Sequence, residues 1–101
     1  DILHGKHIFN AITSGGKRNV YQSTGYNRFT VREFLVPFEQ TAVLCGMNYL
    51  PPFAVQGTHR LTLEELEKAG KDYGRLIEKL VKGDFDLKEM QEYEFLNDWL
   101  K

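Results

Sequence analysis

The feature that most constrains the fold is a short apolar segment that lacks strict alternation. Residues 7–13 read HIFNAIT, and the segment stops at Gly15 and Gly16. Strands that are covered on both faces, as in parallel sheets, carry apolar residues in this way. We therefore expect a buried parallel strand over residues 7–13, followed by a glycine-rich loop.

A helix is expected to begin at Thr30 and to stop near Gly46. Thr30 and Glu33 have the spacing of a capping box, in which each residue bonds to the other's backbone amide. Pro37 removes one amide donor and crowds the preceding turn, so we expect a kink or a restart there. The expected apolar face comprises Phe34, Phe38, Ala42 and Cys45.

A second strand is expected over residues 53–58, after Pro51 and Pro52. A strand, helix, strand crossover makes the two strands parallel and nearly always right-handed. The fold class is therefore α/β. Two strands are too few for a stable sheet, so the missing ones are expected from a longer chain, a bound complement or a swapped partner.

Two further helices are expected in the C-terminal part. Thr62 and Glu65 form a second capping box, and the helix should end before Gly83, with Gly70 and Gly74 marking close packing or a bend. Its expected apolar stripe is Leu63, Leu66, Ala69, Leu76, Ile77 and Leu80. The tail from Asp86 has the pattern of a third amphipathic helix, which we expect to pack on its own domain rather than on another subunit.

Composition limits the partners and the compartment. At 101 residues the chain is at most one domain, and its net charge of -1 provides no basic field to collect nucleic acid or anionic lipid. The single cysteine, Cys45, excludes an internal disulfide and is expected to be an inert apolar residue. No apolar run reaches the roughly 20 residues of a membrane span, so a cytoplasmic location is expected. The first residue, Asp1, indicates a fragment.

The residues that follow the first strand are the candidate site. Thr13, Ser14, Gly15 and Gly16 lie where open α/β sheets place their ligands, although a plain turn explains the pattern equally well. Lys17 and Arg18 are either a solvated pair or contacts to an anion. His59 follows the second strand, where the default interpretation is a turn histidine bound to backbone.

The segments LHGKHIFNAITSGG and EFLVPFEQTAVLCGMNYLPPF, with Tyr21, Gly25 and Asn27 between them, resemble the flavodoxin-like NAD(P)H:quinone oxidoreductase family. That family includes DT-diaphorase and the ancillary subunits of glutathione-gated potassium-efflux systems. The resemblance runs over residues 3–60. It implies that residues 1–101 are the C-terminal portion of one flavodoxin-like doubly wound sheet, holding two strands and about three helices. The N-terminal half, with its phosphate-binding loop, is absent.

The resemblance also implies roles for individual residues. Those matching residues 13–16 wrap the flavin ring of FMN or FAD, and Tyr21 matches an aromatic residue beside that ring. Asn27 stands where DT-diaphorase has a histidine, so it can donate a hydrogen bond but cannot relay protons. Tyr26 is a candidate for lining the quinone pocket, with an exposed loop aromatic as the equal alternative.

The function that the resemblance implies is two-electron reduction of quinones by NADPH or NADH in a homodimer. The alternatives are a regulatory subunit of a potassium-efflux membrane protein, which would hold the chain at the inner face of the membrane, and an inert fragment. The 101 residues alone are expected to be inactive. No metal is expected, because His4 and His7 share no ligand face and no further His or Cys lies near them in the sequence.

Overall fold

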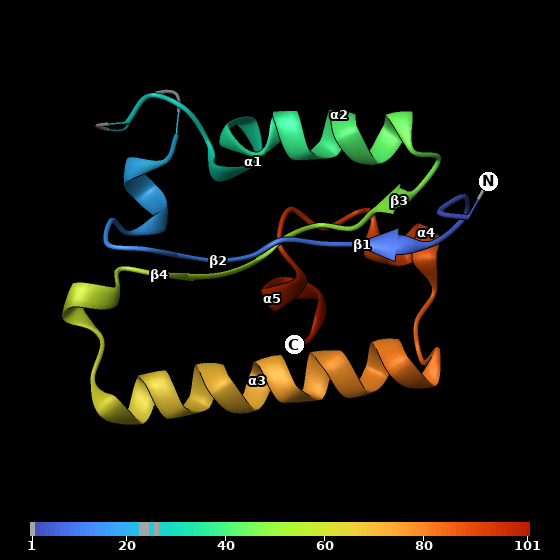
Figure 1. Cartoon of the computed structure of the whole chain (residues 1–101). Helices are drawn as coiled ribbons and strands as arrows, with labels where there is room; N and C mark the ends of the chain where they lie inside the picture. The colour runs from blue at the N-terminus through green and yellow to red at the C-terminus, as the bar shows by residue number, and fades with distance from the viewer. Residues whose placement is uncertain (1, 23–24, 26) are drawn as a thin grey trace.

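The computed structural model describes residues 2–22, 25 and 27–101, and its elements alternate between strands and helices (Figure 1). In chain order they are β1 (His7–Ile8), β2 (Ala11–Ser14), the 3-10 turn η1 (Arg18–Val20), α1 (Val31–Phe34), α2 (Val36–Leu44), β3 (Asn48–Tyr49), β4 (Phe53–Gln56), the 3-10 turn η2 (Thr58–Arg60), α3 (Leu63–Lys82), α4 (Leu87–Met90) and α5 (Leu96–Trp99). The expected α/β class is confirmed; the first expected strand and two of the expected helices are divided into shorter pieces, β4 matches the second expected strand, and β3 is an additional strand.

The strands pair in parallel, as the crossover predicts. β1 pairs with β3 and β2 pairs with β4. Between the two pairings, residues 9–10 on the first side face residues 50–52 on the second, so the second side carries one extra residue. Pro51 and Pro52 lie in this extra segment and have no amide to give to a ladder, which is why the pairing, and with it the first expected strand, is interrupted.

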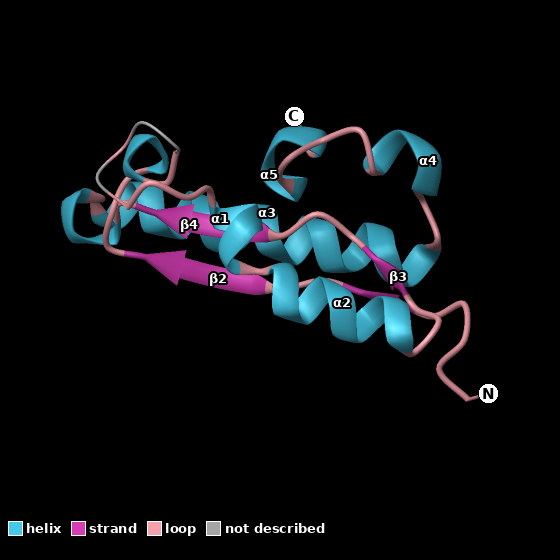
Figure 2. Ribbon diagram, turned by 90° about the horizontal axis from the view of Figure 1, so that it is seen from above, coloured by secondary structure: helices cyan, strands magenta, loops and turns pink. Residues whose placement is uncertain are grey.

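Helices cover both faces of the strands. Figure 1 shows α1 and α2 on one face and α3 on the other, and Figure 2 shows α5 beside β4. The Leu96 amide donates to the Pro52 carbonyl at 2.8 Å. The Asn97 side chain accepts from the Ala54 amide at 3.0 Å and donates to the Ala54 carbonyl at 2.8 Å. Asn97 therefore takes the place of a neighbouring strand at the outer edge of β4.

The opposite edge of the sheet differs from the edge beside Asn97. In the described part of the chain, no strand lies along the outer side of β1 and β2. Ile8, Ala11 and Thr13 on these strands are exposed. Native sheets usually cover, shorten or charge such an edge, and in the described residues this edge is left open.

Both expected capping boxes are confirmed. The Thr30 and Thr62 hydroxyls accept from the amides of Glu33 and Glu65, each at 3.1 Å, and the two glutamates accept in return at 2.9 Å. The expected restart near Pro37 is confirmed as well, because α1 ends before Leu35 and α2 carries the proline in its first turn.

The expected apolar face of the first helix is wrong. Val31 and Leu35 are buried at 4% and 7% exposure, whereas Phe34 and Phe38 are 52% and 55% exposed. Ala42 is buried as expected. Apolar residues lie on both sides of this helix, so their spacing alone could not select the buried side.

The core consists of two adjoining clusters. One holds Leu50, Phe53, Leu76, Met90 and Leu96. The other holds Val31, Leu35, Ala54 and Phe95, with Ile12 and Tyr21 packed against it. The tail thus contributes to both clusters, which confirms that it packs on its own domain.

The tail does not form one continuous helix. Asp86 caps α4 as expected, accepting from the amides of Lys88 and Glu89, but the chain leaves the helix until α5. Arg32 donates to the Glu94 carbonyl at 3.0 Å, and the Leu96 amide bonds to Pro52. These tertiary bonds use backbone groups that a continuous helix would need for itself.

None of the helices within the described ranges is both long enough and apolar enough to cross a bilayer.

Candidate functional site

The carboxyl ends of β2 and β4 lie side by side, and each leads into a 3-10 turn (Figure 1). The loop after β2 holds Gly15 and Gly16, and the loop after β4 holds Gly57 and His59. The Gly57 amide donates to the Gly16 carbonyl at 2.9 Å and joins the two loops. The residues that the sequence singled out after each strand therefore meet at one end of the sheet.

The side chains of Thr13 and Ser14 lie in different environments, because neighbouring residues of a strand point to opposite faces of the sheet. The Ser14 hydroxyl donates to the Gly16 carbonyl at 2.8 Å and so fixes the turn. Thr13 is exposed and lines an apolar groove on the α3 side of the sheet. Of the four residues 13–16, the two glycines thus have the backbone best placed to meet a ligand.

Neighbouring side chains leave no room for a Cβ at Gly15 or Gly16. A Cβ on Gly15 would lie 2.7 Å from the His59 ring, and one on Gly16 would lie 2.7 Å from the Val20 side chain and 3.2 Å from Tyr21. Neither glycine has a positive φ. Their lack of a side chain is therefore explained by close approach rather than by backbone conformation.

The amides of Gly15 and Gly16 are available to a ligand. Among the hydrogen bonds of the described residues, none is donated by either of these two amides. Two adjacent backbone donors at the carboxyl end of a strand suit a planar group with acceptor atoms along one edge.

Tyr21 lies beside the glycine pair. It is half-buried, packs on the cluster of Val31, Leu35, Ala54 and Phe95, and meets Phe34 edge to face at 6.0 Å. Its ring also lies beside Gly16. This packing holds the aromatic ring in place next to the loop.

Asn27 closes the same loop through its backbone, since its amide donates to the Val20 carbonyl at 2.9 Å. Tyr26, which the sequence placed at the quinone pocket, lies outside the described residues.

The Arg18 side chain contacts two carboxylates of the C-terminal segment. Its guanidinium meets Glu94 at 2.6 Å and Asp98 at 3.3 Å and lies 4.5 Å from the centre of the Phe95 ring. The hydrogen bond to Glu94 raises the pKa of Arg18 above its ordinary value. In this structure Arg18 joins the glycine loop to the C-terminal segment, a contact across 76 residues that the sequence pattern did not indicate.

A pocket of about 270 Å³ opens beside the glycine pair. Its lining consists of Gly15, Gly16, Lys17, Asn19, Val20 and Arg60. The charged side chains of this lining are both cationic, so the pocket favours a ligand with acceptor atoms or negative charge.

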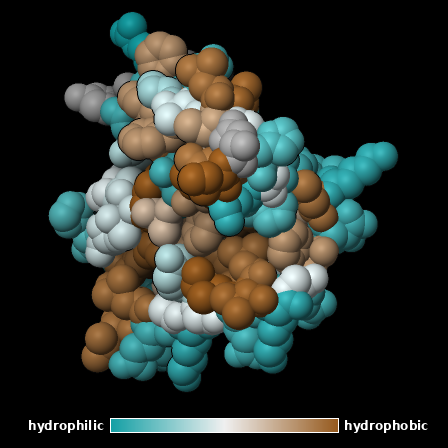
Figure 3. Space-filling model, turned by 45° about the vertical axis from the view of Figure 1, so that its right-hand side comes forward, coloured by the Kyte–Doolittle hydropathy of each residue, from teal (hydrophilic) through white to brown (hydrophobic). Residues whose placement is uncertain are grey.

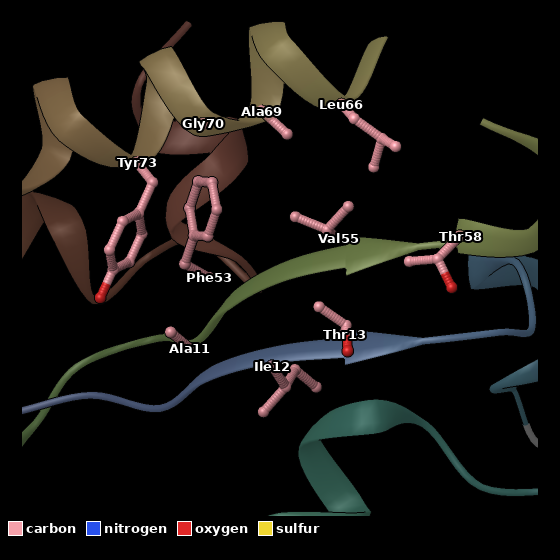
Figure 4. A pocket seen from close by; sticks show the side chains of 10 residues that line it. All are labelled: Ala11, Ile12, Thr13, Phe53, Val55, Thr58, Leu66, Ala69, Gly70 and Tyr73. Atoms are coloured by element: carbon pink, nitrogen blue, oxygen red, sulfur yellow. The ribbon is translucent and has the colours of Figure 1, made fainter. Parts of the chain in front are cut away.

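A separate groove of about 460 Å³ lies between α3 and the sheet (Figure 4). It is lined by Ala11, Ile12, Thr13, Phe53, Val55, Thr58, Leu66, Ala69, Gly70 and Tyr73. A Cβ on Gly70 or Gly74 would meet no described atom within 4 Å, so the close packing considered for these glycines is not present. Figure 3 shows apolar side chains reaching the surface of the molecule on the face it displays.

The remaining histidines lie far from the glycine loop in the fold. His4 lies against Gly46, and the His7 ring is 3.3 Å from the Asn48 side-chain nitrogen, at the amino end of the strands. Within the described ranges, no three His, Cys, Asp or Glu side chains are grouped as a metal site would require. Cys45 is a half-buried free thiol.

Comparison with known proteins shows which proteins this chain resembles. A family model described as flavodoxin-like fold matches residues 1–77. The chain is 34% identical to general stress protein 14 of Bacillus subtilis over 76% of its own length and 44% of that protein's. It is 36% identical to the glutathione-regulated potassium-efflux system ancillary protein KefG of Cronobacter sakazakii, over 82% of this chain and 46% of KefG.

Two further matches extend the comparison. The uncharacterized NAD(P)H oxidoreductase YrkL of Bacillus subtilis is 36% identical over 77% of this chain and 43% of YrkL. A solved structure named as a thermophilic tryptophan halogenase from Streptomycin violaceusniger superimposes with a TM-score of 0.67 at 31% identity, over 70% of this chain and 41% of that one. The chain spans less than half the length of each of these relatives.

Proposed function

Because the chain belongs to the flavodoxin-like NAD(P)H:quinone oxidoreductase family, we propose that the protein it forms part of is a flavin-dependent oxidoreductase. In this proposal the protein binds FMN or FAD without a covalent bond, takes hydride from NADPH or NADH, and reduces a quinone by two electrons. The observation that carries the proposal is the pair of unengaged amides at Gly15 and Gly16 beside Tyr21.

The residues fit a flavin by their donor chemistry. Acceptor atoms line the N1, C2 and O2 edge of the ring, and the Gly15 and Gly16 amides supply donors for such an edge. A bound flavin supplies the capacity to accept hydride and to pass on two electrons. Amide donors held in place before the reaction favour the negative charge that reduction adds to this edge.

The other site residues have positioning roles in this proposal. Tyr21 is held by the core cluster, so its ring limits where a planar ligand can lie. Ser14 fixes the turn through the Gly16 carbonyl. Asn27 and Tyr26 remain the candidates for hydrogen bonding and for lining the quinone pocket, as the family resemblance implies.

We also propose that residues 1–101 are the C-terminal part of one flavodoxin-like domain. Asn97 covers the outer edge of β4, whereas the outer edge of β1 and β2 is open. An amino-terminal half would add its strands along that open edge and would cover the exposed Ala11 and Thr13. The full-length protein, meaning this chain joined to that half, would bind flavin, and the 101 residues alone would bind it poorly.

Relatives named as ancillary subunits of a potassium-efflux system support a second role. In this alternative the full-length protein binds a membrane transporter and regulates it, with or without catalysis. Co-purification with such a transporter favours regulation.

The family resemblance also implies a homodimer. Phe34, Val36 and Phe38 on α1 and α2 are exposed apolar side chains, and a subunit interface would cover such side chains. Sedimentation of the full-length protein as a monomer at micromolar concentration counts against the dimer.

Steady-state turnover of the purified full-length protein tests the enzymatic proposal. With NADPH or NADH as donor and a soluble quinone as acceptor, consumption of the nicotinamide should depend on quinone and on bound flavin. In double-reciprocal plots of initial rate against nicotinamide concentration, parallel lines at several quinone concentrations would fit a ping-pong cycle. A flavin-loaded protein that oxidises neither nicotinamide in the presence of quinones would contradict this proposal.

A further inference from the structure

His59 lies directly on the glycine pair, although it is separated from it by more than 40 residues of sequence. It is the middle residue of η2, two residues after Gly57, and its ring atoms Cδ2 and Nε2 are each 2.7 Å from the position that a Gly15 Cβ would take. Because Gly15 has no positive φ, contact with this imidazole is what excludes a side chain there. The His59 ring thus packs closely on Gly15 and joins the loops that follow β2 and β4.

His59 is also the only histidine of the chain at this end of the sheet. The chain contains three histidines, and His4 and His7 lie at the amino end of β1, by Gly46 and Asn48. Asn27, which stands where DT-diaphorase carries a histidine, has an amide side chain instead. The imidazole beside the glycine loop is therefore that of His59.

The two loops that meet at the glycine pair carry three cationic residues. Arg60 follows it in η2, and Lys17 approaches Gly57 with its Cγ 3.1 Å from the position of a Cβ there. Arg18, in η1, is bound to the carboxylates of Glu94 and Asp98. The described side chains that line the adjoining pocket include cations but no carboxylate, so negative charge arriving on a ligand would find cationic groups beside it.

We infer that His59 is a site residue that donates a hydrogen bond to the polar edge of the ring held by Gly15 and Gly16. This inference rests on the proposed flavin site and adds a residue to it. A bound flavin that accepted hydride, one proton with two electrons, from NAD(P)H would gain one negative charge and leave NAD(P)⁺. The His59 N–H would stabilise that charge without giving up its proton, which would favour the reduced ring over the oxidised ring.

The midpoint potential of flavin bound to the full-length protein tests this inference. It should be measured for the wild type, for His59→Ala, which removes the N–H donor, and for His4→Ala as the matched control. His59→Ala should lower the ratio of reduced-flavin to oxidised-flavin affinity by about tenfold, the size of one charge-assisted hydrogen bond. His4→Ala should match the wild type.

Nuclear magnetic resonance gives a second reading that does not depend on turnover. On addition of FMN, the imidazole Cε1–H resonance of His59 should shift, while those of His4 and His7 should not. A bound flavin whose midpoint potential is the same in His59→Ala and the wild type would overturn the role of His59. A wild-type protein that binds no flavin would instead overturn the proposed site itself.

Discussion

At the scale of single residues, the glycine pair shows how a loop can be specified by what its neighbours occupy. Gly15 and Gly16 both lack the positive φ that often explains a glycine in a turn. The side chains of His59, Val20 and Tyr21 fill the space that a Cβ would need. The loop backbone is therefore kept close to three side chains and free to approach a ligand.

Gly16→Ala should disturb this loop. Its added Cβ would lie 2.7 Å from Val20, so the loop or Val20 must shift, and we expect FMN affinity of the full-length protein to fall at least about tenfold. Fluorescence quenching of FMN measures the affinity. Gly74→Ala is the matched control, because a Cβ there meets nothing within 4 Å and α3 should gain about 0.5–1 kcal/mol. Equal FMN affinity in both variants would speak against a ligand at the loop.

The residue-level features that could be predicted were the local ones. The capping residues Thr30 and Thr62 act within three positions of their partners, so spacing alone identified them. The Gly15–His59 contact and the Arg18–Glu94 ion pair join distant segments, and nothing in their neighbourhoods in sequence marks them as partners. His59 was noted only for following a strand, and its contact with Gly15 required the fold.

At the scale of elements, the caps decide where the helices begin. Thr62→Ala removes the hydroxyl that accepts from the Glu65 amide, and it should lower the free energy of unfolding by about 1 kcal/mol. Thr62→Ser should retain most of the stability, since serine caps as well as threonine does. Urea unfolding followed by circular dichroism gives the values. If Thr62→Ala and Thr62→Ser are equally stable, the cap contributes nothing.

The errors of element prediction have one physical source. The helix near Thr30 has apolar residues on two sides, and the tail has a helical pattern that tertiary hydrogen bonds from Arg32 and Leu96 interrupt. Likewise, the interruption near Pro51 follows from the ladder register rather than from the apolar pattern. The local sequence predicted where the elements lie. Tertiary packing determined which helix faces are buried and where the elements are interrupted.

Asn97 gives a further test at this scale, because its side chain replaces a strand partner for Ala54. Asn97→Ala should leave the amide and carbonyl of Ala54 without these bonds and should cost about 1–3 kcal/mol. Chemical denaturation measures the loss, with Gln40→Ala on the exposed side of α2 as the control. An equal loss of unfolding free energy in both variants would show that the hydrogen bonds between Asn97 and Ala54 do not stabilise the fold.

At the scale of the whole molecule, the two edges of the sheet have different roles. Asn97 and Leu96 cover β4, and the edge of β1 and β2 remains open, which agrees with a chain that spans less than half of its relatives. The α/β class and the family were predictable because a strand, a glycine loop and a crossover helix lie in order along the sequence. The covering of one edge by a side chain was not, since it depends on the tail folding back.

The central claim is that the full-length protein holds a flavin at the Gly15–Gly16 loop. The most direct measurement is the visible absorption spectrum of that protein, followed by anaerobic addition of NADPH. We predict bands at roughly 370 and 450 nm that bleach on addition. A colourless protein that binds neither FMN nor FAD when they are supplied would contradict the account.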